Sequence, residues 1–216
     1  QLPVSSLIFR VCPSTLSLQC GKAIALVIDA AYIDFAGDEE EYRRFLPKLE
    51  RLPENVISIM AYSLSKTYTL YGTRCGAMIC IAKTKEIADE FKRVCEYSSR
   101  GSWSNSAKVA QVILSRIYGD KELLENVNSE RAYYREMLSK RGRAFTEAAE
   151  EAGLEIVPFD AGFFISIPCD NPDEISARLE KKGLFIVPLA KGLRVSVASI
   201  SEEKCRKLPA MIKDAM

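Results

Sequence analysis

The first part of this chain alternates continuous apolar runs with segments of helical periodicity. The runs at 23–28, 56–61 and 75–82 have the length of strands, and the first is typical of a strand buried on both faces of a parallel sheet. Helices are predicted where apolar residues recur every three or four positions, over 38–49, 84–97 and 105–118. Residues 7–11 have the pattern of a further strand. This order predicts an α/β fold.

The last part of the chain has a different rhythm. One long, highly charged helix is predicted over residues 121–152, with Gly153 as its C-terminal stop. Shorter elements follow it: strands at 154–158, 163–168, 184–188 and 193–198, and helices at 172–182 and 202–215. They predict a small α+β domain. We therefore place a domain boundary inside the long helix, near Glu130, which gives domains 1–130 and 131–216.

Composition and charge argue against several classes of protein. The net charge is +1 without a basic stripe, so no nucleic-acid partner is expected. The seven cysteines form no CxxC pair and histidine is absent, which disfavours a metal site and removes Ser-His-Asp and Cys-His mechanisms. Scattered cysteines in apolar runs favour reduced thiols and a cytoplasmic location. No apolar run approaches the roughly 20 residues of a membrane span, and residues 1–10 do not resemble a signal peptide.

Polar side chains follow two of the predicted strands, where open α/β sheets bind ligands. The set consists of Asp29 and Tyr32 after the first strand, and Ser63, Ser65, Lys66 and Arg74 after the second. Taken singly, such an aspartate is often a helix cap, a tyrosine packs, a serine forms a turn, a lysine is solvated and an arginine forms an ion pair. The order and spacing of the whole set carry the functional signal.

The set meets the chemical demands of pyridoxal phosphate. Partial removal of a lysine from water favours the neutral amine, which is the nucleophile that bonds to this cofactor. We predict Lys66 as that residue and as the catalytic acid and base, Asp29 as the partner of the pyridine nitrogen, and Tyr32 as the partner of the ring oxygen. The phosphate requires a hydroxyl and a guanidinium, which Ser63 and Arg74 supply. Ser65 is the second candidate hydroxyl.

The motif also resembles that of a known family. Asp29-Ala-Ala-Tyr32, followed by Ser63-x-x-Lys66 and by Arg74 eight residues beyond the lysine, is similar to fold-type I pyridoxal-phosphate-dependent aminotransferases of the aspartate and aromatic group. The resemblance implies part of the mostly parallel large-domain sheet of that fold, plus its small C-terminal α+β domain.

The resemblance covers nearly the whole chain from Lys22 onward. Residues 100–105, Arg-Gly-Ser-Trp-Ser-Asn, are similar to a stretch that reaches the neighbouring subunit in family dimers, which implies a homodimer. Residues 192–196 are similar to the small-domain strand whose arginine binds the substrate carboxylate, here Arg194, and Gly162 corresponds to a glycine beside the substrate. The family's Asn-Pro-Thr-Gly turn is not found in residues 1–21, and the chain resembles the C-terminal half of an aminotransferase.

The resemblance implies transfer of an amino group between an amino acid, with aspartate and aromatic amino acids as candidates, and a 2-oxo acid. Two alternatives remain open. One is another fold-type I enzyme, such as a lyase, racemase or synthase, because a fold does not fix the reaction. The other is a non-catalytic role, either as the domain of a transcription regulator or as an inactive fragment.

Overall fold

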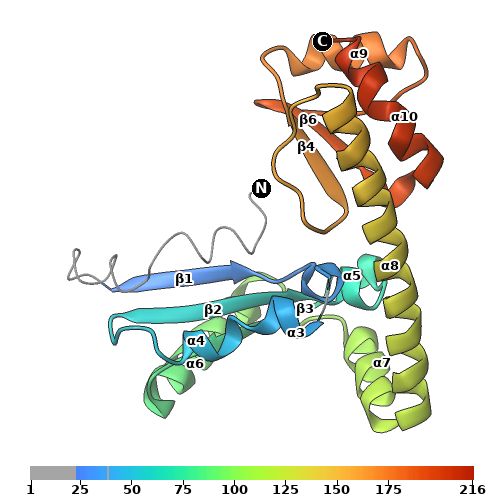
Figure 1. Ribbon diagram of the computed structural model, residues 1–216. Helices are drawn as coiled ribbons and strands as arrows, with labels where there is room; N and C mark the ends of the chain where they lie inside the picture. Colours follow the sequence, from blue (N-terminus) through green and yellow to red (C-terminus); the bar gives the residue numbers. More distant parts are fainter. Residues whose placement is uncertain (1–22, 38) are drawn as a thin grey trace. The chain divides into compact units, whose positions relative to one another are not determined.

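The computed structural model describes residues 23–37 and 39–216 (Figure 1). This part of the chain divides into two compact units, one ending at Arg131 and the other beginning at Ala132. The strand predicted over residues 7–11 lies outside the described residues.

The first unit is built on a three-stranded mixed sheet (Figure 1). Its strands are β1 (Ile24–Asp29), β2 (Val56–Ser63) and β3 (Gly76–Ile81), which confirms the three strands predicted from apolar runs. β1 pairs with β2 in parallel and β3 pairs with β2 antiparallel. Asp29 lies opposite Ala61 and Ser63 lies opposite Gly76, so β1 and β2 end at the edge of the sheet where β3 begins.

The prediction that β1 is buried on both faces is wrong for the described residues. Ile28 is buried, but its neighbour Val27 is 63% exposed. Alternate residues of a strand point to opposite faces, and only one face of β1 is covered, by Phe45, Leu49 and Leu52. β3 likewise exposes Met78. The apolar runs predicted strands correctly, but hydrophobicity alone does not show what covers the second face.

The helix predicted over residues 38–49 is also wrong, because two short helices occupy this region. They are α3 (Glu39–Arg43) and α4 (Leu46–Leu49), which has Pro47 in its first turn. A proline ring clashes with the carbonyl group four residues earlier, here that of Arg43, and this is where α3 ends. The proline therefore explains the break in the helix.

Two longer helices follow the sheet. α6 (Lys85–Ser102) begins at Thr84, whose Oγ1 accepts a hydrogen bond from the Ile87 backbone nitrogen at 3.4 Å. α6 contains no fully buried residue, whereas the next helix, α7 (Lys108–Gly119), buries Ala110 and Ile117. Both helices were predicted, with boundaries displaced by a few residues.

The second unit packs an antiparallel sheet against helices (Figure 1). The long helix α8 (Lys121–Glu151) leads into it, and the order of its strands is β4-β6-β5. The remaining elements are β4 (Phe164–Pro168), α9 (Pro172–Glu180), β5 (Val187–Leu189), β6 (Gly192–Ser196) and α10 (Glu202–Lys213). One large apolar core joins them and includes Phe145, Ile165, Leu193 and Ile212, each 0% exposed.

The strand predicted at 154–158 is absent from this sheet, which is a third correction. Val157 donates one backbone hydrogen bond to the Ser166 carbonyl at 2.9 Å, but Pro158 has no N–H with which to continue a ladder.

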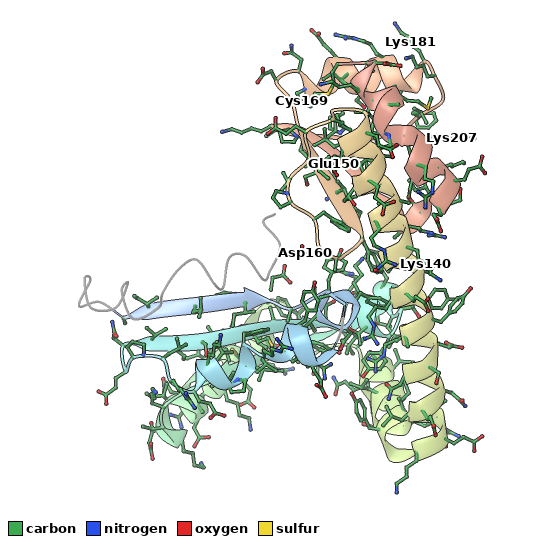
Figure 2. The ribbon with its side chains drawn as sticks, in the orientation of Figure 1. Lys140, Glu150, Asp160, Cys169, Lys181 and Lys207 are labelled. Atoms are coloured by element: carbon green, nitrogen blue, oxygen red, sulfur yellow. The ribbon has the colours of Figure 1, made fainter. Side chains whose placement is uncertain are left out.

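Charged residues lie on the outside of the second unit. Lys140 of α8 and Lys207 of α10 are exposed and form ion pairs with Glu136 and Glu203, each four residues earlier (Figure 2). Within residues 23–37 and 39–216, no helix is both long and apolar enough to span a membrane.

Candidate active site

The end of β1 forms a turn that leads to Tyr32. Asp29 is the last residue of the strand and is exposed, and its Oδ1 accepts a hydrogen bond from the Ala31 backbone nitrogen at 3.0 Å. This local bond orders the turn into the short 3₁₀ helix η1 (Ile33–Phe35), which begins after Tyr32. The sequence Asp-Ala-Ala-Tyr thus places a carboxylate and a phenol on successive parts of one ordered turn.

The end of β2 passes directly into the four-residue helix α5 (Leu64–Thr67). Ser63 is its N-cap, and its Oγ accepts a hydrogen bond from the Ser65 backbone nitrogen at 3.2 Å. The hydroxyl proton of Ser63 is not used by this contact, so it can still donate to an anion. Leu64, Ser65 and Thr67 are buried while Lys66 is only partly so, and the helix therefore directs the lysine away from the interior.

The amine of Lys66 lies against aromatic rings. Its Nζ is 4.5 Å from the centre of the Tyr71 ring and 5.6 Å from that of Tyr32. Both distances are within the range of cation–π attraction. No carboxylate forms an ion pair with Lys66 in the described part of the chain. Tyr71, to which sequence reasoning assigned no role, also lies beside Arg74, whose Cζ is 5.0 Å from the centre of its ring. Its ring therefore contacts both Lys66 and Arg74.

Arg74 has an unusual backbone conformation after the 3₁₀ helix η2 (Tyr71–Thr73). Its φ of 49° and ψ of 44° are left-handed, which costs a residue with a side chain roughly 1–2 kcal/mol. Its Nη1 donates to the Tyr71 carbonyl at 3.0 Å and approaches the Ser65 Oγ at 3.5 Å, a long hydrogen bond. The structure therefore brings Arg74 back beside Ser65, so that a guanidinium and a hydroxyl lie side by side.

A buried carboxylate that sequence reasoning missed lies behind these residues. Asp34, in η1, accepts hydrogen bonds from Arg43 Nη2 at 2.6 Å, Thr67 Oγ1 at 2.7 Å and Tyr62 Oη at 2.8 Å. Burial raises the pKa of Asp34, but the hydrogen bonds from Thr67, Tyr62 and Arg43 and the charge of Arg131 outweigh it, and the net pKa is below the usual value. Burial, together with the neighbouring carboxylate, raises the pKa of Tyr62. An aspartate between isoleucine and phenylalanine was the available signal, but its partners are distant in sequence.

The second unit holds the remaining predicted residues. Arg194 lies in β6, opposite Ser166 of β4 and Val187 of β5, with its Cζ 4.6 Å from the centre of the Phe164 ring. Its Nε is buried and has no hydrogen-bond partner among the described residues. A buried N–H without an acceptor is costly, so this atom fits an anionic oxygen from a ligand.

Gly162 precedes β4 and has a φ of 120°, which favours glycine. No described atom lies within 4 Å of the position that its Cβ would occupy. The backbone conformation, rather than a close neighbour in the described residues, accounts for the glycine here.

Comparison with known proteins defines the class. An aminotransferase from Anaerococcus prevotii is 36% identical, with a TM-score of 0.87 over 98% of this chain and 50% of that chain. An aromatic-amino-acid aminotransferase from Burkholderia pseudomallei, covalently bound to pyridoxal phosphate, has a TM-score of 0.69 at 19% identity, over 94% of this chain and 50% of that one. The described fold is thus similar to that of aminotransferases.

The family model for aminotransferase class I and II matches residues 16–212, and the chain belongs to this family, which depends on pyridoxal phosphate. It is 26% identical to an aspartate aminotransferase of Haemophilus influenzae, over 84% of this chain and 46% of that protein. It is 29% identical to a histidinol-phosphate aminotransferase of Nitratidesulfovibrio vulgaris, over 82% of this chain and 44% of that protein. The chain spans about half the length of these relatives.

The side chains present are compatible with the family's cofactor. The first unit offers an amine that pairs with no carboxylate in the part of the chain the structure describes, an adjacent phenol, and a hydroxyl beside a guanidinium. These groups match the aldehyde, the ring oxygen and the phosphate of pyridoxal phosphate. The buried Nε of Arg194 is a donor without an acceptor among the described residues.

Proposed function

We propose that this chain carries the cofactor-attachment part of a pyridoxal-phosphate-dependent aminotransferase, which moves an amino group between an amino acid and a 2-oxo acid. The observation that carries the proposal is the arrangement around Lys66. Its amine lies against Tyr32 and Tyr71, on a helix that starts where β2 ends, and Arg74 returns beside Ser65 in the same loop. In this proposal, residues 1–130 are part of the large domain, and residues 131–216 are the connecting helix and the small domain.

Each residue has a separate task in the proposal. Lys66 would hold the cofactor covalently; once the substrate amine displaced it, its freed amine would take a proton from the substrate Cα and return it to the product. Asp29 faces the pyridine nitrogen and Tyr32 the ring oxygen, while Ser63, Ser65 and Arg74 bind the phosphate. The bound cofactor supplies an electron sink for the pair of electrons released at Cα.

Arg194 is proposed to orient the substrate through an anionic group, and Gly162 to leave space beside it. The names of the relatives point to two kinds of substrate, aspartate and histidinol phosphate. Aspartate carries an α-carboxylate, and histidinol phosphate carries a phosphate. The unpartnered Nε of Arg194 accommodates either anion. The proposal extends to a cytoplasmic homodimer, whose oligomeric state sedimentation would measure.

The test is chemical trapping of the cofactor. The purified chain is incubated with pyridoxal phosphate and reduced with borohydride, and modified peptides are identified by mass spectrometry. We expect the modification on Lys66, its loss in Lys66→Ala, and no change in Lys108→Ala, which removes an exposed lysine from α7. Undiminished modification in Lys66→Ala would refute the assignment. Incubation with aspartate, an aromatic amino acid or histidinol phosphate, with product analysis, separates amino transfer from elimination or racemisation.

A further inference from the structure

Asp34 has no task in the proposed chemistry, yet its carboxylate is the meeting point of four segments. Its side chain is 6% exposed, and its three donors come from α3, β2 and α5. An ionised carboxylate offers about four acceptor sites, so most of them are occupied. Losing any of these donors would leave a buried oxygen without a hydrogen bond, which costs free energy. The carboxylate therefore holds the segments that donate to it in one arrangement.

The donor from α5 matters most for Lys66, because Thr67 is the next residue. α5 has only four residues, and helices this short are unstable without outside contacts. Ser63 fixes its first turn, and the bond from Thr67 to Asp34 fixes its last residue. Thr67 is 2% exposed, so its hydroxyl has no water to replace the carboxylate. The direction of the Lys66 side chain therefore depends on this bond.

Tyr32 lies two residues before Asp34, at the start of η1, so the bonds that hold Asp34 act on the same short segment. Tyr32 and Lys66 are distant in sequence, and the described residues connect their two segments through the bond between Asp34 and Thr67. The charged and titratable groups that face Asp34 are Arg43 of α3, Tyr62 of β2 and Arg131 of α8. The two arginines stabilise the ionised form, so the link persists at neutral pH.

We propose that Asp34 is a positioning residue, which through Thr67 holds the amine of Lys66 at Tyr32 and Tyr71. The inference rests on the proposed function in taking Lys66 as the attachment site. It adds that attachment requires the helix α5 to be held in one orientation by its bond to the buried carboxylate of Asp34.

The direct measurement is the position of the Lys66 amine without any cofactor. Lysines of the purified chain are reductively methylated with ¹³C-formaldehyde, and the Lys66 methyl signal is assigned by its loss in Lys66→Arg. In the unmodified sequence we expect this signal to lie apart from those of exposed lysines, because two aromatic rings are within 6 Å of Nζ. Thr67→Val removes the hydroxyl that donates this bond, and Asp34→Asn removes the charge that accepts it. In both variants the signal should move towards the position of exposed lysines, and further in Thr67→Val. Thr67→Ser should restore it.

Two control variants separate positioning from general stability. Tyr62→Phe also removes one hydrogen bond to Asp34, together with the contact between the Tyr62 and Thr67 hydroxyls, but leaves the bond from Thr67 to the carboxylate, so the Lys66 signal should stay. Thr84→Val makes the same chemical change as Thr67→Val, at the start of α6. Circular dichroism shows which variants retain the native fold. The proposal is overturned if Thr67→Val and Asp34→Asn leave the signal unchanged, or if Tyr62→Phe moves it equally.

Cofactor trapping gives the second readout. At a subsaturating concentration of pyridoxal phosphate, Thr67→Val should reduce modification of Lys66 by about tenfold, the equivalent of one charged hydrogen bond. If the unmodified sequence itself is not labelled at Lys66, the proposed function fails, and the methyl signal still decides whether Asp34 positions the lysine. If labelling occurs and is equal in Thr67→Val, the positioning role is wrong while the proposed function stands.

Discussion

The two units of the chain are stabilised by different kinds of contact. Residues 132–216 bury both helices and strands in one apolar core, whose central side chains are 0% exposed. The described residues of the first unit have two smaller apolar clusters, and its sheet and α6 expose large apolar side chains. Its most connected buried group is instead a carboxylate, Asp34. The difference teaches that the unit that contains Lys66 relies on directional polar contacts around a buried carboxylate.

The largest effect should come from the apolar core of the second unit. Phe145 of α8 is 0% exposed, and Phe145→Ala should lower the free energy of unfolding by about 3–5 kcal/mol, through lost transfer energy and a cavity. A contrasting change in the first unit, Val94→Ser on α6, replaces an apolar side chain that is 57% exposed. It should lower the free energy of unfolding by less than about 0.5 kcal/mol. Urea unfolding of both variants measures the two losses in free energy of unfolding. Equal losses would contradict the difference between the two units.

Asp34→Asn should have the next largest effect, about 1.5–3 kcal/mol at pH 7, because it weakens hydrogen bonds to a buried charge. The pKa of Asp34 is lowered in the folded state, so its contribution is complete above the unfolded value of about 3.9 and is lost as the pH falls through the folded pKa. The stability difference between the two proteins should therefore shrink below about pH 4. Urea unfolding across this range measures it, and a constant difference would contradict the role of the ionised form.

Tyr68→Phe should have a smaller effect than Asp34→Asn. Tyr68 ends α5, and its Oη lies 2.9 Å from that of Tyr118 in α7, so the loss should be about 1 kcal/mol. Burial and this hydrogen bond raise the pKa of Tyr68 to about 12. The stability it contributes is complete below about pH 10 and is lost as the pH rises towards 12. Alkaline titration of tyrosinate absorbance should lose one late component in Tyr68→Phe, and an unchanged titration would refute the assignment.

Local pattern predicted most elements of the fold. Apolar runs identified β1, β2 and β3, helical periodicity identified α6 and α7, and charge with a C-terminal glycine identified α8, because these signals arise within one element. The failures depend on other information. Pro47 ended α3 through a backbone clash four residues away, and the exposed face of β1 depends on which segments cover it.

The candidate site was predictable where its residues are close in sequence. The spacing from Ser63 to Lys66 and Arg74 identified one loop, and in the structure Arg74 does return to Ser65 within it. Asp34 was not predictable, because its partners Arg43, Tyr62 and Thr67 are 9, 28 and 33 residues away. Only the folded chain shows that they share one carboxylate.

The place of α10 in the second core has a consequence for synthesis on the ribosome. Cys205 and Ile212 of this last helix are 0% exposed and pack with β4 and β6, so that core cannot close until α10 has been translated. The pairing of β1, β2 and β3 is already available once residue 81 has emerged. Between these two points the nascent chain therefore displays a paired sheet with exposed apolar side chains, and aggregation is expected to compete with folding during this interval.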